Sequence, residues 1–230
     1  MYYQDVKSDM VSGLPLAISI FIRLREDILR RKLKNGEKLT EQRICDEYNV
    51  SRTPVREAFR LLDQEGLIQM VPNRGAFVMG FEEQDIADMY DMRKEYEVLA
   101  FRWAAERMTE EDLDKIRNAY DLMEFYTHKG DTVKAAEMNV VFHDHIYEAS
   151  HNRQLTGILT TYQYYTKLLR SQEEDHTAEH LSEVLAEHKE ILESLESRDA
   201  ERGIPVVKKH LEKSKIRAGY GGFSGNASKE

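Results

Sequence analysis

The stretch that most constrains the fold is residues 39–78, where two short helical patterns are followed by two strand-like runs. At about 100° per residue, the second helical pattern has an apolar face and, well separated from it, a basic face. The apolar face consists of Val55, Ala58, Phe59 and Leu62, and the basic face of Arg52, Thr53, Arg56 and Arg60. Such a helix can pack on its predecessor by one face while the other enters a DNA major groove, which is the geometry of a helix-turn-helix.

Local start and stop signals agree with this arrangement. Thr40 and Ser51 are placed to cap the first turns of the two helices, and Asn49 between them tolerates the positive φ that the turn needs. Gly66 ends the second helix. The two strand-like runs and the turn between them are residues 67–71, 76–79 and 72–75. The sequence therefore predicts a winged helix-turn-helix that binds double-stranded DNA.

The same segment resembles the DNA-binding domain of the GntR family of bacterial transcription regulators. The matching pieces are Val-Ser-Arg-Thr-Pro-Val-Arg-Glu-Ala (50–58), the following Leu…Glu-Gly-Leu, and Asn-Arg-Gly-Ala-Phe-Val (73–78). In that family, the first helix of the motif, the start of the recognition helix and the wing contact DNA. The resemblance implies DNA contacts by Arg43, Ser51, Arg52, Thr53, Arg56, Arg74 and Gly75. The sequence departs from the family at Asn49, where glycine is usual, and asparagine is the next-best residue for that backbone.

The net charge of −9 is unevenly distributed along the chain. Residues 1–80 hold 13 Lys and Arg against 11 Asp and Glu, whereas residues 81–230 hold 20 against 31. Because local basic residues decide a DNA contact, the total charge does not argue against DNA binding. We do not expect the acidic part to touch DNA.

Two features indicate a cytoplasmic protein with no membrane partner. The single cysteine, Cys45, excludes an internal disulfide and is compatible with a reducing compartment. The apolar run near the N-terminus, residues 14–22, is too short to span a membrane and lacks the flank of a signal peptide.

Beyond Gly80 the pattern becomes wholly helical, so the predicted fold is mainly α, with an all-α bundle after the winged helix. The predicted domains are a flexible N-terminus (1–13), the winged helix-turn-helix (14–79), a helical ligand-binding and dimerisation domain (82–217) and a flexible tail (218–230). Helices are expected near 14–33, 82–107, 109–129, 131–150, 152–172, 177–197 and 203–217, with Arg202-Gly203 as the last break.

Three histidines lie in apolar stripes of three different predicted helices: His143, His188 and His210. A polar ring that faces a core needs a partner. Each ring could simply be hydrogen-bonded within the core. Alternatively, the three could meet on a transition metal, with Asn139, one turn before His143, supplying an oxygen.

The helical part resembles the FCD effector domain of the FadR subfamily within the same family. The matching pieces are residues 142–152, 187–200 and 207–211. Many such domains hold zinc, nickel or a similar ion through an aspartate and three histidines, which implies Asn139, His143, His188 and His210 as ligands here. Asn139 replaces the usual aspartate. A neutral amide is a weaker ligand, and it leaves the site more positive by one charge and more attractive to an anion.

The predicted helix 82–107 has two apolar stripes, which indicates burial on both sides and favours a ligand pocket. Arg93 and Glu97 are four residues apart and can pair, or Arg93 can grip a ligand carboxylate bidentately. In resembling domains an arginine here often lies near the effector. Tyr90 and Tyr147 are further candidates for the pocket.

Together these features predict a homodimeric transcription regulator, not an enzyme, that reads a pseudo-palindromic operator. We expect a repressor whose helical domain binds a small carboxylate metabolite beside a divalent transition metal. One alternative keeps the DNA-binding part but makes the helical domain a metal-free sensor and dimerisation bundle. A remote alternative is a metal-dependent hydrolase that uses the three histidines.

Overall fold

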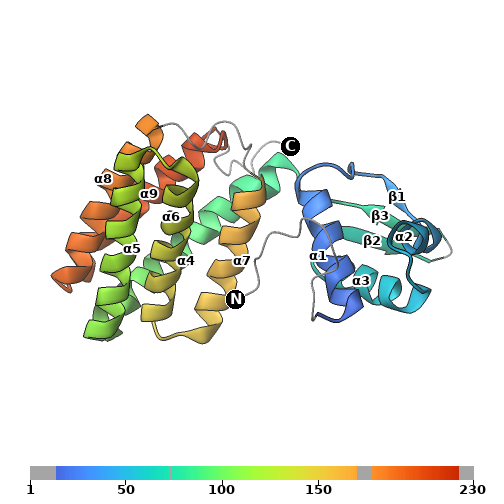
Figure 1. The fold of residues 1–230 in the computed structure, drawn as a ribbon, viewed down its shortest axis with the longest axis horizontal. Helices are drawn as coiled ribbons and strands as arrows, with labels where there is room; N and C mark the ends of the chain where they lie inside the picture. Colours follow the sequence, from blue (N-terminus) through green and yellow to red (C-terminus); the bar gives the residue numbers. More distant parts are fainter. Residues whose placement is uncertain (1–13, 73, 170–177, 223–230) are drawn as a thin grey trace, which may run out of the picture. The chain divides into compact units, whose positions relative to one another are not determined.

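The computed structural model describes residues 14–72, 74–169 and 178–222. The chain divides into two compact units, residues 1–82 and 83–230 (Figure 1). The first unit combines helices with a small sheet, and the described part of the second is helical throughout. Residues 1–13 and 223–230, for which we expected flexible ends, lie outside the described ranges. Within those ranges no helix is long and apolar enough to cross a membrane.

In the first unit β3 lies between β1 and β2 and runs antiparallel to both. The elements in chain order are α1 Leu16–Leu29, β1 Lys38–Leu39, α2 Glu41–Tyr48, α3 Arg52–Gln64, β2 Ile68–Val71 and β3 Gly75–Val78. The predicted wing had only the last two strands. Strand β1 was missed because two residues are too few to show the alternation by which a strand is recognised.

The capping and turn residues predicted for α2 and α3 act as expected, with one exception. Thr40 accepts a hydrogen bond from the backbone N–H of Arg43 at 3.2 Å, and Asn49 has φ of 52°. Ser51 occupies the N-cap position of α3, but its hydroxyl makes no capping bond within the described chain. The apolar face of α3 is buried as predicted, with Val55, Ala58, Phe59 and Leu62 at most 1% exposed.

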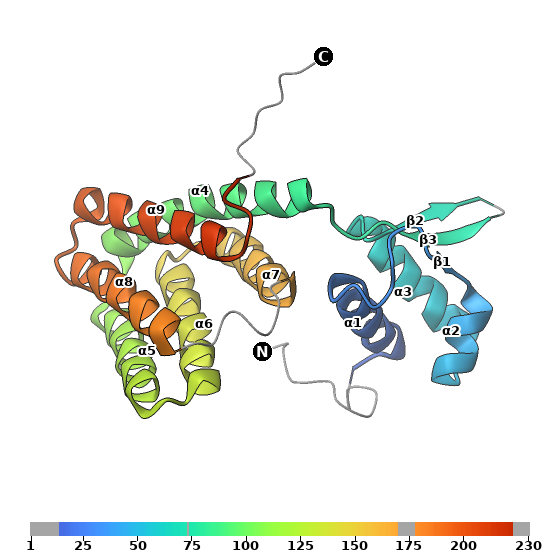
Figure 2. The same ribbon diagram turned by 90° about the horizontal axis from the view of Figure 1, so that it is seen from above.

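The second unit is a helical bundle in which α4 runs alongside α9 (Figure 2). The helices are α4 Glu83–Arg107, α5 Glu110–Lys129, α6 Thr132–Ala149, α7 Arg153–Leu169, α8 Ala178–Glu196 and α9 Ala200–Arg217. Helix α5 packs against α6 and α8, and α4 also contacts α6 and α7. The core includes Phe101, Ile116, Phe142 and Leu195, each at most 1% exposed. This packing brings one face each of α4, α6, α8 and α9 together.

The predicted break at Arg202-Gly203 is wrong, because α9 already begins at Ala200. The turn before it contains Arg198, which has φ of 52°, and Asp199, whose side chain accepts from the backbone N–H of Arg202 at 3.0 Å. Gly203 is instead a buried helical residue, and a Cβ there would collide with the ring of Phe101 on α4. The glycine permits a close helix contact and does not end a helix.

The second apolar stripe of α4 is less buried than predicted. Met92 is 46% exposed, and Tyr96, Leu99 and Trp103 are partly buried. The last three pack around Leu155 and Leu159 of α7 and around Ala100 and Tyr147.

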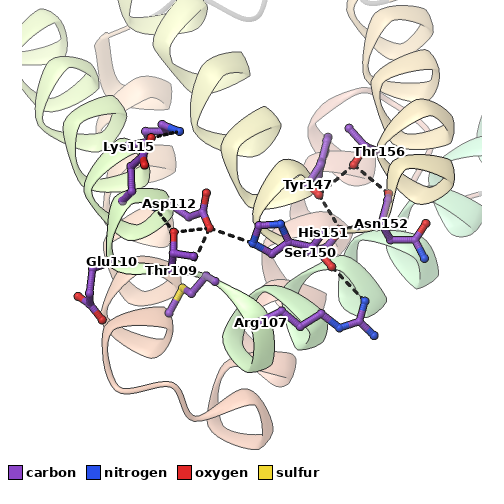
Figure 3. A network of polar contacts seen from close by, with 12 residues as sticks. Arg107, Thr109, Glu110, Asp112, Lys115, Tyr147, Ser150, His151, Asn152 and Thr156 are labelled. Carbon is purple, nitrogen blue, oxygen red and sulfur yellow. Dashed lines mark hydrogen bonds and ion pairs between the residues drawn. The ribbon is translucent and has the colours of Figure 1, made fainter.

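A polar network joins the α4–α5 junction to the α6–α7 junction (Figure 3). His151 Nε2 lies 3.0 Å from Asp112 Oδ2, and Asp112 also closes the capping box of α5. The carbonyl of Tyr147 accepts hydroxyl hydrogen bonds from Ser150 at 2.6 Å and Thr156 at 3.0 Å. The network therefore anchors the end of α6 on which Tyr147 lies.

Candidate functional site

The residues of the sequence-predicted DNA face lie on α2, α3 and the wing, and all of them are exposed. They are Arg43, Ser51, Arg52, Thr53, Arg56, Arg74 and Gly75. Buried Val55 and Phe59 on the other side of α3 determine which side faces outward. The face therefore combines an outward helix with guanidinium groups, which can donate to phosphates and to base edges.

Three of these arginines are held by acceptors that the sequence analysis did not identify. Arg43 Nη1 lies 2.7 Å from Glu37 Oε1, and Arg56 Nε lies 2.8 Å from Glu41 Oε1. Arg52 Nη2 donates to Gln42 Oε1 at 3.1 Å. These contacts cross between α3, α2 and the loop before β1, so the spacing within one helix could not reveal them.

In the wing, Gly75 opens β3 with φ of 103°. A Cβ at this position would approach Cε of Lys38 to 3.3 Å. The positive φ and the proximity of Lys38 both favour glycine at this position. Because glycine has no side chain, the backbone of the wing can come close to another molecule.

In the second unit, α6, α8 and α9 bring His143, His188 and His210 together in the core, at 3%, 0% and 5% exposure. One ring nitrogen from each lies within 4.8 Å of the others. The shortest separation is 3.1 Å, between Nε2 of His188 and Nε2 of His143. Zinc binds imidazole nitrogens at about 2.0–2.1 Å, so two such ligands stand roughly 3.4 Å apart in a tetrahedral site. The observed separation is close to this value.

Asn139 lies one turn before His143 on the same helix, so the two side chains share a face. Its Oδ1 is buried and has no hydrogen-bond partner among the described residues. A buried oxygen without a partner among the described residues, on the helix face that carries His143, is a candidate metal ligand.

Two of the histidines, His188 and His210, are held in the neutral form that binds metals. Burial lowers the pKa of His188 well below its ordinary value, and the neighbouring His210 and His143 lower it further. Burial also lowers the pKa of His210, to about 4, although a hydrogen bond from its ring to Glu187 opposes this shift.

Two glutamates contact the Nδ1 atoms of two of these rings. Glu97 Oε2 lies 3.1 Å from Nδ1 of His143, and Glu187 Oε2 lies 2.7 Å from Nδ1 of His210. The helical spacing indicated Glu97 only as a partner of Arg93, and no pattern in the sequence pointed to Glu187. These contacts join separate helices, so no local spacing could indicate them.

Two of the three candidate effector residues, Arg93 and Tyr147, lie next to the same cluster. Arg93 Nε donates to Glu97 Oε1 at 2.6 Å, so the pairing that the spacing allowed does occur, and both side chains are buried. Tyr147 is 1% exposed, with its ring centroid 6.1 Å from that of His143. Tyr90 is 3% exposed, and its ring stacks on Tyr220 at 6.0 Å. Arg93, Glu97 and His143 thus form a continuous polar chain.

Two family models match the chain. The model described as "Bacterial regulatory proteins, gntR family" matches residues 16–78, and the FCD domain model matches residues 88–213. The first match spans the winged helix, and the second covers more than half of the chain and includes all three clustered histidines.

Known proteins that resemble this chain over most of its length agree with these matches. The chain is 26% identical over 202 residues to the uncharacterized HTH-type transcriptional regulator YdhC of Bacillus subtilis, covering 86% of this chain and 88% of that protein. It is also 26% identical over 202 residues to the galactonate operon transcriptional repressor of Escherichia coli, covering 79% and 87%. The solved structure of E. coli McbR/YncC has the same fold, with a TM-score of 0.67 at 20% identity, covering 89% of this chain and 97% of that one.

Proposed function

Because this chain belongs to the gntR family of bacterial regulatory proteins and carries an FCD domain, we propose that it is a repressor whose helical domain senses a small carboxylate beside a transition-metal ion. It is a DNA-binding transcription regulator, as the members of the family are. The hydrolase alternative is not retained, because the family and the similar proteins are regulators.

For the DNA-binding part, we propose that Arg52, Thr53 and Arg56 of α3 enter the major groove while Arg74 and Gly75 of the wing contact the backbone or minor groove. The exposure of these residues supports this arrangement. We propose that Arg43 and Ser51 add contacts at the ends of the motif. Two copies of the chain would read a pseudo-palindromic operator in the cytoplasm, because half-site symmetry mirrors the two-fold symmetry of a dimer.

For the metal, the observation that carries the proposal is the convergence of three buried imidazoles. The Asn139 oxygen, one turn before His143, is buried and has no hydrogen-bond partner among the described residues. His143, His188, His210 and Asn139 would hold zinc or nickel, since nitrogen ligands suit both ions. The ion would supply a positive centre that binds an anionic ligand. The four side chains of this chain would determine its position.

The charges around the cluster favour an anion. The charged side chains hydrogen-bonded within it are two carboxylates, Glu97 and Glu187, and three cations, Arg93, Lys213 and Arg217. A divalent ion would add two positive charges, and Asn139 contributes none. A small carboxylate would offset this excess, and Arg93 offers a planar donor that matches its geometry.

We propose that ligand binding acts on DNA affinity by population shift. A carboxylate that binds Arg93 competes with Glu97 for the same guanidinium, and so acts on the contact between Glu97 and His143. If the ligand binds one arrangement of the regulator more tightly than another, it shifts the equilibrium by that difference. Burial raises the pKa of Tyr147 well above its ordinary value, as does the charge of Glu97, so Tyr147 remains a neutral hydroxyl beside the pair. We propose it, with Tyr90, as part of the ligand site.

One observation favours the metal-free alternative. His143 and His210 already donate to carboxylates, as satisfied core histidines do. That alternative explains the contact between the Nε2 atoms of His188 and His143 as a hydrogen bond, but it leaves Asn139 Oδ1 without a partner among the described residues.

The test is elemental analysis by mass spectrometry of gently purified protein, beside the His188→Ala variant. About one transition-metal ion per chain, lost in the variant, supports the metal centre. Absence of metal after incubation with zinc and nickel supports the metal-free bundle. Gel shifts with the operator, with and without gluconate or galactonate as first carboxylate probes, then test whether an anion releases the DNA.

A further inference from the structure

The Nδ1 atom of His143 lies 3.1 Å from Oε2 of Glu97, and the Nδ1 atom of His210 lies 2.7 Å from Oε2 of Glu187. An ionised carboxylate can only accept a hydrogen bond, so the Nδ1 atom of each ring carries the proton. A neutral imidazole protonated at Nδ1 has its lone pair on Nε2. In His143, Nε2 is the atom that lies 3.1 Å from His188. In His143 the carboxylate therefore orients the lone pair toward His188, and in His210 it leaves Nε2 as the nitrogen that can bind a metal.

Both carboxylates are themselves fixed. Glu97 is held by Arg93 at 2.6 Å, and Glu187 accepts from Lys213 at 2.9 Å and from Arg217 at 3.0 and 3.1 Å. Burial alone would raise the pKa of the Glu97 carboxyl, but the charge of Arg93 and the hydrogen bond from His143 bring it below its ordinary value. The pKa of Glu187 is lowered in the same way, against its burial, by hydrogen bonds from His210, Arg217 and Lys213. Both carboxylates are therefore held in place by the side chains of Arg93, Lys213 and Arg217.

The third ring provides a contrast within the same cluster. Nδ1 of His188 lies 3.4 Å from Sδ of Met123, and a thioether is only a weak acceptor. Two rings thus have a fixed tautomer, and the third can carry its proton on either nitrogen. In the metal-free chain, a proton on Nε2 of His188 can be donated to Nε2 of His143.

We propose that Glu97 and Glu187 are positioning residues of the metal centre. They would bring negative charge close to the ion without binding it, whereas Asn139, a neutral ligand, brings none. This inference rests on the proposed metal site. Carboxylates that accept from a ligating histidine fix its orientation and raise its basicity, and their loss typically weakens metal binding by about 10–100-fold. Glu187 acts from α8 on a ligand of α9, and Glu97 from α4 on a ligand of α6.

The experiment measures the zinc affinity of the metal-stripped, full-length chain by competition with a chromophoric chelator. We expect Glu187→Gln and Glu97→Gln each to bind zinc about 10–100-fold more weakly than wild type. Glu183→Gln, which removes the same charge from an exposed position one turn before Glu187 on α8, should bind zinc like wild type. With Co²⁺ in place of zinc, the two test variants should show an altered visible absorption spectrum, which a purely structural role would leave unchanged.

The outcomes separate the two hypotheses. If wild type binds zinc and Glu187→Gln binds it equally well, the positioning role is wrong while the metal site stands. If wild type binds no metal, the proposed metal site itself fails. Should the variants not fold, ¹⁵N NMR of the histidines in metal-free wild type decides, because the proposal requires two rings protonated at Nδ1. Finding His143 or His210 protonated at Nε2 instead would overturn it.

Discussion

Arg56 on α3 donates its Nε–H to Oε1 of Glu41 on α2 at 2.8 Å. The contact joins the two helices of the motif at their exposed surface. It also places a carboxylate beside a guanidinium that we propose to reach DNA. Because phosphate and base acceptors compete for the same donors, the pair must open or rearrange when DNA binds.

Replacing Glu41 with glutamine should therefore raise the affinity for DNA of unrelated sequence by a factor of about three to ten, since it removes a negative charge next to the phosphates. Fluorescence anisotropy with a scrambled duplex at fixed salt measures the change. Glu106→Gln, at an exposed position of α4 in the other unit of the chain, makes the same change of charge outside the motif and should have no effect. An equal rise in both variants would mean that only net charge matters.

Arg52→Ala should weaken operator binding by about 5-fold to 150-fold, which is the discrimination given by one bidentate base contact. The side chain is exposed, so the helical circular dichroism and the melting temperature should not change. Arg30→Ala, on the exposed end of α1, is the matched control. Unchanged gel-shift affinity of Arg52→Ala would refute the assignment of α3 as the recognition helix.

His188 is fully buried at the centre of the cluster, so its role can be tested by thermal denaturation with and without metal. A ligand that binds only the native state stabilises it by mass action, so added zinc should raise the melting temperature of wild type. In His188→Ala this rise should vanish. A variant that gains as much stability from zinc as wild type would show that His188 only fills the core.

Asn139→Asp should tighten zinc binding by at least about tenfold, since it adds a charged ligand to a set of neutral ones. The same change should destabilise the metal-free protein, because it buries a carboxylate where an unsatisfied amide oxygen now lies. Competition titration and melting of the stripped protein measure the two effects. Equal zinc affinity in Asn139→Asp and wild type would place this side chain outside the coordination sphere.

Gly203→Ala should lower the free energy of unfolding by about 1–3 kcal/mol, because the added methyl group has to displace the ring of Phe101. Gly157→Ala on α7 is the control. A Cβ there meets nothing within 4 Å, so the higher helix propensity of alanine should leave stability equal or raise it by up to about 1 kcal/mol. Urea denaturation followed by circular dichroism compares them. A Gly203→Ala variant as stable as wild type would show that the two helices can separate at little cost.

The winged helix was predictable because its signals are local. The Thr40 cap, the left-handed Asn49 and the apolar face around Phe59 each depend on residues within one or two turns of the chain. The stripes that contain His143, His188 and His210 were readable for the same reason. A helix presents every third or fourth residue on one face whatever it packs against.

Only the tertiary structure decided what those faces meet. Glu97 and Glu187 contact histidines on other helices, which lie far away in sequence. The need for glycine at position 203 comes from the ring of Phe101 on another helix. The break predicted at that glycine was wrong because a glycine that ends a helix and one that admits a neighbour look alike in sequence. Local periodicity thus determined which residues turn inward. The packing of α4, α6, α8 and α9 determined which of them meet, because hydrogen bonds depend on distances that no spacing along one helix specifies.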